Sequence, residues 1–166
     1  MITAAGRRRS RKLSAASFTS TPRKQSYTFF VDRDLGRKIV PQALRDAGGQ
    51  VEIHDDHFPQ GALDAEWLPE VGRRGWVLVT KDREIRYRAA EREALLNAGV
   101  RAFVLRTRGL SGPENAQILV RALPRMVRFC IGNPPPFIAA VLPSGGVTML
   151  FRESRRRRRR RRAPRS

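Results

Sequence analysis

Apolar and polar residues alternate along the middle of the chain in blocks that predict strands and helices in turn. Short apolar runs predict strands, and longer stretches with an apolar residue every three or four positions predict helices. The strands are expected at 27–31, 51–53, 76–80 and 100–105. The helices that follow them are expected at 38–47, 64–74, 83–97 and 115–129.

This order predicts an α/β fold, a three-layer sandwich with a mostly parallel central sheet and helices on both faces. The run 76–80 is almost entirely apolar, as expected of a strand that is covered on both sides. Two further apolar runs, 137–142 and 147–151, flank Pro, Ser and two Gly residues and predict a C-terminal β-hairpin. Residues 54–63 are expected to form a loop that ends at Asp64, a favourable N-cap for the next helix.

Charge separates the ends of the chain from its middle. The 166 residues carry a net charge of +19, but residues 25–153 hold 18 Lys and Arg against all 15 Asp and Glu. Arginine runs cannot pack into a core, so we predict a disordered basic arm at 1–25, one domain at 26–153 and a disordered poly-Arg tail at 154–166. The sequence leaves open whether these ends bind nucleic acid through its phosphates or have no selected role.

The single cysteine, Cys130, excludes an intrachain disulfide and a cysteine-based zinc site. Between Phe129 and Ile131 it is expected to be a small buried apolar residue. No stretch approaches the roughly 18 apolar residues of a membrane span, and the first residues lack the apolar segment of a secretory signal. These features predict a soluble protein of the reducing cytoplasm with no membrane partner.

Six acidic residues lie where the predicted strands end or where a predicted helix begins. They are Asp32 and Asp34, Asp64 and Glu66, and Asp82 and Glu84. The carboxyl ends of parallel strands share one crevice, so these side chains can converge there. Convergent carboxylates repel one another unless a hard cation neutralises them, and Mg²⁺ or Mn²⁺ suits such oxygen ligands. The pattern therefore predicts a divalent-metal site of the kind that cuts phosphodiesters.

The segments that contain these acids, 29–36, 63–67 and 77–85, resemble the PIN-like nuclease superfamily, which includes ribonuclease toxins of bacterial toxin–antitoxin pairs. The resemblance is greatest to the small branch related to VapC toxins, and it extends over nearly all of 27–151. It implies a PIN-like fold and a Mg²⁺- or Mn²⁺-dependent endoribonuclease that hydrolyses RNA. It also implies an antitoxin protein as a partner, and it leaves open whether the chain forms a homodimer.

Carried over by position, the resemblance implies that Asp32, Asp64 and Asp82 are catalytic metal ligands and that Glu84 is a fourth ligand. Asp34 and Glu66 are extra carboxylates with no firm counterpart, and we expect them to support the ligands. Thr80, at the strand end, is expected to orient a ligand or a bound phosphate through its hydroxyl. Four basic residues within eight positions of Asp82 are expected to contact the RNA backbone. They are Lys81, Arg83, Arg86 and Arg88. The spacing from Asp32 to Asp64 is shorter than in the larger toxins, so the number of metal ions stays open.

Several of these residues also have a purely structural interpretation. Asp64 can serve as a helix cap, and Glu84 can pair with a nearby arginine on a helix surface. The His54-Asp55-Asp56-His57 segment contains metal-ligating residue types, but its tight spacing favours a solvated turn.

Two other functions compete with the nuclease hypothesis. One is a nucleic-acid-binding protein that has the PIN-like fold and Arg-rich ends but no catalysis. The other is a phospho-receiver domain, which also has an acidic crevice beside a parallel sheet. The second fits poorly, because Thr80, Lys81 and Asp82 all follow a single predicted strand.

Overall fold

The structure is a computed structural model that describes residues 26–154 and 159–160. The predicted basic arm 1–25 and most of the predicted tail 154–166 lie outside the described residues, so the expected division of the chain stays a prediction. The strands are β1 (Thr28–Val31), β2 (Gln50–Ile53), β3 (Val77–Thr80), β4 (Arg101–Leu105), β5 (Phe137–Val141) and β6 (Val147–Arg152). The α-helices are α1 (Ile39–Asp46), α2 (His54–His57), α3 (Asp64–Arg73), α4 (Ala89–Ala98) and α5 (Gly112–Gly132). Two short 3₁₀ helices, η1 (Arg33–Leu35) and η2 (Glu84–Arg86), follow β1 and β3.

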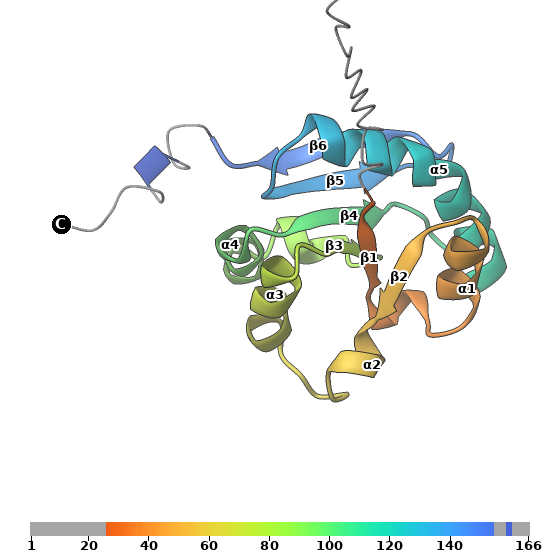
Figure 1. Cartoon of the computed structure of the whole chain (residues 1–166), viewed down its shortest axis with the longest axis horizontal. Coiled ribbons are helices and arrows are strands. Elements are labelled where there is room, and N and C mark those ends of the chain that lie inside the picture. The colour runs from red at the N-terminus through yellow and green to blue at the C-terminus, as the bar shows by residue number, and fades with distance from the viewer. Residues whose placement is uncertain (1–25, 155–158, 161–166) are drawn as a thin grey trace, which may run out of the picture.

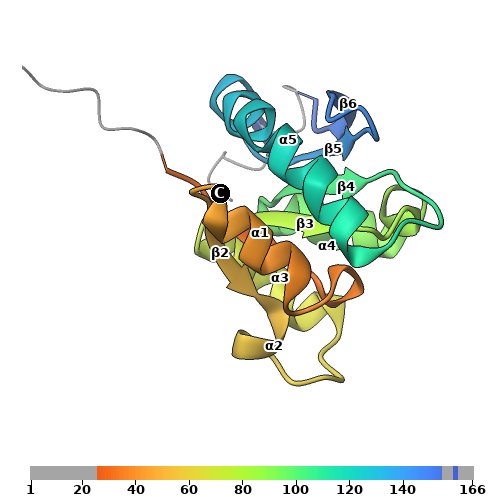
Figure 2. The ribbon, with the colours of Figure 1, turned by 90° about the vertical axis from the view of Figure 1, so that its right-hand side faces the viewer.

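The six strands form one sheet in the order β2-β1-β3-β4-β5-β6. Every neighbouring pair is parallel except β5 and β6, which form the predicted hairpin. Helices α1 and α5 contact each other on one face of the sheet, and α3 and α4 contact each other on the other (Figure 1). Figure 2 shows α1 and α5 side by side in front of the sheet. The predicted three-layer α/β fold with a mostly parallel sheet is confirmed.

The core lies in two layers because successive strand residues point to opposite faces. In β1, Phe29 and Val31 pack in the layer beneath α1 and α5, whereas Phe30 packs in the layer beneath α3 and α4. The predicted stripe of Trp67, Leu68 and Val71 on α3 is buried in the second layer. Both faces of the sheet are therefore covered, as the apolar run at β3 indicated.

Helix α5 is longer than the predicted 115–129 because its first turn is capped. The Ser111 hydroxyl accepts a hydrogen bond from the Glu114 N–H at 3.4 Å, and the Glu114 carboxylate accepts one from the Ser111 N–H at 2.7 Å. This reciprocal capping box satisfies backbone donors that have no partner within the helix, so the helix begins at Gly112.

The helix expected at 83–97 is interrupted. Residues 84–86 form η2, and α4 begins only at Ala89, because Arg88 has an extended backbone conformation. The Asp82 carboxylate accepts a hydrogen bond from the Glu84 N–H at 2.8 Å, which fixes the tight turn after β3. The single-helix prediction was therefore wrong in its first turn, where side-chain hydrogen bonding to the backbone competes with helix formation.

The expected loop 54–63 begins with the helical turn α2, so the prediction was wrong for residues 54–57. His54 is only 3% exposed and packs against Phe30, Phe58 and Trp67. Burial lowers its pKa, and the positive charge of Arg33 lowers it further. Aromatic packing thus outweighs the polar composition of this turn.

Cys130 is buried, as expected, and burial raises the pKa of its thiol to about 12. Within 26–154 and 159–160, no helix has both the length and the apolar character needed to cross a membrane.

The contact between α3 and α4 depends on Gly72. A Cβ atom at this position would lie 1.8 Å from the carbonyl oxygen of Ala98, a backbone atom that can move only with its helix. We expect Gly72→Ala to lower the free energy of unfolding by about 1–3 kcal/mol, as overpacking does. Urea denaturation measures the change.

Gly132→Ala is the matched control for this test, since a Cβ atom at Gly132 meets nothing within 4 Å. This variant is expected to leave the midpoint of urea denaturation unchanged or to raise it slightly. A Gly72→Ala protein as stable as the parent would contradict the close approach of the two helices.

Candidate metal centre

Asp32 is held at the carboxyl end of β1 by its own backbone and by the turn that follows. Its N–H donates to the carbonyl oxygen of Val79 on β3 at 3.0 Å. Its Oδ1 accepts the Arg33 N–H at 2.7 Å and thereby caps η1. The second carboxylate oxygen, Oδ2, is left to face the end of the neighbouring strand β3.

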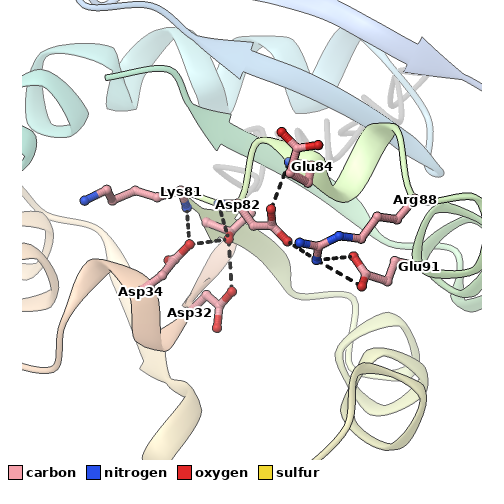
Figure 3. A network of polar contacts seen from close by, with 8 residues as sticks. Asp32, Asp34, Lys81, Asp82, Glu84, Arg88 and Glu91 are labelled. Carbon is pink, nitrogen blue, oxygen red and sulfur yellow. Dashed lines mark hydrogen bonds and ion pairs between the residues drawn. The ribbon is translucent and has the colours of Figure 1, made fainter. Parts of the chain in front are cut away.

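Thr80 connects the acids of β1 to those that follow β3. Its hydroxyl oxygen is fully buried and lies 2.9 Å from Asp32 Oδ2 and 2.9 Å from Asp34 Oδ2 (Figure 3). A hydroxyl has one proton, so it donates to one carboxylate at a time. The same oxygen accepts the Asp82 N–H at 3.0 Å. Thr80 therefore contacts two of the carboxyl groups and the backbone of the third acid, and its role in supporting metal ligands stays a prediction.

Among the acids of this group, Asp34 has the most strongly raised pKa. Loss of hydration on burial, followed by the negative charge of Asp32, raises the pKa of Asp34 from 3.8 to about 6. Much of the residue is exposed, so the lost hydration is local to the oxygen that meets Thr80 and the Lys81 N–H. That N–H donates to Asp34 Oδ2 at 2.7 Å and partly offsets the effect.

Asp64 lies at the start of α3 and shares the electrostatic environment of the other acids. Burial raises its pKa, and the negative charges of Glu91, Asp32 and Asp82 raise it further. A site shared with the acids at the ends of β1 and β3 would produce such charge effects, and the place of Asp64 in that site stays a prediction.

Asp64 is not the N-cap that the sequence suggested. The N-cap is Leu63, and Asp64 is the first helical residue. The cap is supplied by Glu66, whose carboxylate accepts the Leu63 N–H at 3.0 Å. Glu66 thus caps the helix, whereas the Asp64 carboxylate accepts a hydrogen bond from the Trp67 side chain, which offsets part of the rise in its pKa.

Arg33 holds the segment before α3 against the end of β1. Its Nε lies 2.6 Å from the carboxylate of Asp55, and its other nitrogens donate to the carbonyl oxygens of Pro59 and Gln60. The residue between Asp32 and Asp34 thus fixes the path of the chain that leads to Asp64.

Asp82 shares an arginine with an acid that the sequence analysis missed. Arg88 Nη1 lies 3.3 Å from Asp82 Oδ2 and 3.1 Å from both carboxylate oxygens of Glu91 (Figure 3). Glu91 stands in the first turn of α4 and is the strongest charged influence on Asp64. The sequence would have indicated Glu91 only if the helix had been predicted to begin at Ala89, which puts Glu91 in the first turn. A helix that begins at residue 83 puts Glu91 in its middle instead.

The remaining predicted residues lie around this group. The carboxylate of Glu84 points away from that of Asp82, and the Lys81 side chain extends away from the acids (Figure 3). Arg86 stacks on the exposed ring of Tyr87, with 4.3 Å from its guanidinium carbon to the ring centroid. The metal role of Glu84 and the RNA contacts of these basic residues stay predictions.

The donor set suits a hard divalent cation. Among the residues that the structure describes, no three acidic, His or Cys side chains are arranged as a ready coordination shell. Asp82 is instead paired with half-exposed Arg88, and such surface pairs contribute only about 0–1 kcal/mol, so the pairing does little to oppose a cation at this carboxylate. Crowded carboxylates with raised pKa values gain most from a cation, and an all-oxygen set favours Mg²⁺ or Mn²⁺.

The His54 to His57 segment does not form a second metal site. His57 Nε2 lies 2.6 Å from the carboxylate of Glu52, whereas Asp55 pairs with Arg33 and Arg37. His57 and Asp55 therefore have separate partners, although the burial of His54 differs from the solvated turn that the sequence favoured.

Comparison with known proteins identifies a family. A family model described as "PIN like domain" matches residues 27–107, the part of the chain that contains Asp32, Asp64 and Asp82. Over 125 residues the chain is 35% identical to a protein of Mycobacterium tuberculosis named "Putative ribonuclease VapC45". The match covers 73% of this chain and 90% of that protein. No solved structure gives a significant match.

The raised pKa of Asp34 predicts how stability depends on pH without metal. Because its folded pKa of about 6 exceeds the ordinary 3.8, the folded state binds more protons between these values. The contribution of this carboxyl is therefore complete below about pH 4 and is lost as the pH rises to about 6. In EDTA, we expect the parent protein to lose stability relative to Asp34→Asn over this range. Chemical denaturation at a series of pH values measures the difference, and a constant difference would contradict the assignment.

Proposed function

Because the chain belongs to the VapC-related family of PIN-like nucleases, we propose that it is a metal-dependent endoribonuclease that hydrolyses RNA phosphodiester bonds. The observation that carries the proposal is that the Thr80 hydroxyl joins Asp32 to Asp82 at one edge of the sheet, while the negative charges of both acids raise the pKa of Asp64. The ribonuclease name of the Mycobacterium tuberculosis relative, over most of both chains, supports it.

In this proposal Asp32, Asp64 and Asp82 would hold Mg²⁺ or Mn²⁺. The ion supplies charge stabilisation for the phosphate and a water molecule of lowered pKa. The protein then has to position ligands and substrate, and no side-chain nucleophile is required. The buried Thr80 hydroxyl suits positioning, because its contacts are with carboxylates and a backbone N–H.

Arg88 and Glu91 orient Asp82 from the side of α4. The arginine bridges the two carboxylates, so each limits the rotation of the other. Arg88 also places a positive charge next to the reaction site, where the phosphate of the substrate gains from it. These two residues would act through the position and charge of Asp82.

The proposal extends to a biological setting. We place the protein in the cytoplasm as the toxin of a toxin–antitoxin pair, with a cognate antitoxin that covers the acidic crevice. The single buried cysteine suits a reducing compartment. An antitoxin that blocks the crevice has to offset the exposed acids and arginines there, so we expect it to present charged residues of both signs.

Cleavage of a labelled mixed-sequence RNA by the full chain tests the enzymatic proposal. With Mn²⁺ or Mg²⁺ we expect cutting that EDTA abolishes. Asp82→Asn removes the charge of a ligand but keeps its size, and we expect it to lower the rate by about a hundredfold or more. Gel electrophoresis of the products measures both effects.

Asp46→Asn is the matched control, since Asp46 is an exposed residue of α1 that pairs only with Gln42 in the described structure. It should cut like the parent. RNA binding without any cutting in the presence of metal would refute the enzymatic proposal and favour the non-catalytic nucleic-acid-binding alternative.

A further inference from the structure

We propose that a pocket of arginines beside the acidic crevice binds a phosphate group of the RNA backbone. The pocket has a volume of about 130 Å³. Its basic residues come from two places in the chain, Arg83 and Arg86 after β3, and Arg106 and Arg108 after β4. This inference rests on the proposed function, because it assigns RNA as the ligand.

The pocket gathers positive charge. Four arginines line it, and Glu84 is the single carboxylate in its lining. The ion pairs at η1, α3 and the start of α4 use other arginines. Like charges that are held close together favour the binding of an anion.

One of these arginines has a buried donor with nothing to bind. The Nε of Arg83 is buried and has no hydrogen-bond partner in the described structure. An unsatisfied buried donor costs free energy, about 1–3 kcal/mol, and more for a charged group. A phosphate oxygen is a suitable partner, because guanidinium groups bind phosphates through paired N–H donors.

The topology places this pocket next to the proposed reaction site. Thr80 at the end of β3 pairs in register with Val104 of β4, and Val104 also lines the pocket. Asp82 and Arg83 are adjacent in the chain. The acids after β3 and the arginines after β4 therefore lie at the same edge of the sheet, on strands that are about 4.8 Å apart. An RNA strand that presents one phosphate to the acids would present a neighbouring phosphate to the pocket.

The chemistry favours a phosphate over a base. Arg86 already has one guanidinium face over the Tyr87 ring and one Nη donating to the Tyr87 hydroxyl, so an incoming ligand would meet its remaining N–H donors. Edge donors suit an anion, whereas a base needs an open face for stacking. Arg106 and Arg108 were absent from the basic residues that the sequence predicted, because they follow a different strand.

The decisive experiment follows the Arg83 Nε–Hε signal in the ¹⁵N NMR spectrum of the full chain. A short RNA oligonucleotide is added in EDTA, so that no cleavage occurs, and the signal is assigned by its loss in Arg83→Lys. We expect RNA to shift this signal and to slow its exchange with water. The shift should disappear in the double variant Arg106→Gln, Arg108→Gln.

The matched control is Arg121→Gln, Arg128→Gln, which removes two exposed arginines from α5 and leaves the basic ends of the chain unchanged. It should retain the Arg83 shift. A signal that RNA does not move, or a shift that survives in Arg106→Gln, Arg108→Gln, would overturn the proposal. A shift caused by an acidic peptide but not by RNA would overturn it as well, and would assign the pocket to a protein partner.

Kinetics then separate this inference from the proposed function. If the chain cleaves RNA, loss of Arg106 and Arg108 should raise KM by about tenfold and leave kcat within about twofold. The NMR experiment does not require cleavage. It can therefore show a phosphate pocket even if the protein does not cut RNA, and a protein that cuts RNA but shows no Arg83 shift would be a nuclease without such a pocket.

Discussion

The arrangement of the acidic crevice depends on one buried hydroxyl group. Thr80 ends the central strand β3, and its oxygen contacts the carboxylates of Asp32 and Asp34 and the N–H of Asp82. These contacts join the end of β1 to the turn after β3, so the two acidic turns cannot move independently. Replacing the hydroxyl with a methyl group would leave the strand intact but would remove the bond that brings the acids together.

A second constraint is the repulsion among the acids that this arrangement creates. Asp34 and Asp64 both have raised pKa values, and in each case burial and neighbouring carboxylates are the causes. The protein offsets part of the repulsion with Arg88, which lies between Asp82 and Glu91. A divalent cation would relieve the remainder, and the arginines beyond Glu84 would receive the substrate charge. The proposed metal site and the proposed phosphate pocket are thus adjacent and opposite in sign along one sheet edge.

The sequence predicted the layers of the fold because its strands are short apolar runs and its helices have one apolar face. It also placed Asp32 and Asp82 correctly at strand ends, since parallel topology brings such ends together. It missed Glu91 and the role of Glu66 because both depend on where a helix begins, which is decided by a few hydrogen bonds such as those of Asp82 and Leu63. The arginine pocket was equally hidden, because Arg83 and Arg106 are far apart in the chain and meet only through the pairing of β3 with β4.

The central claim is that Asp32, Asp64 and Asp82 form one metal centre. Isothermal titration calorimetry of Mn²⁺ binding to the full chain tests it most directly. If they do, Asp32→Asn and Asp64→Asn should each weaken the tightest binding by about tenfold or more, although the two residues lie on different elements. Asp46→Asn should bind as the parent does. Mn²⁺ affinity that is unchanged in both crevice variants would contradict the convergence of these acids on a cation.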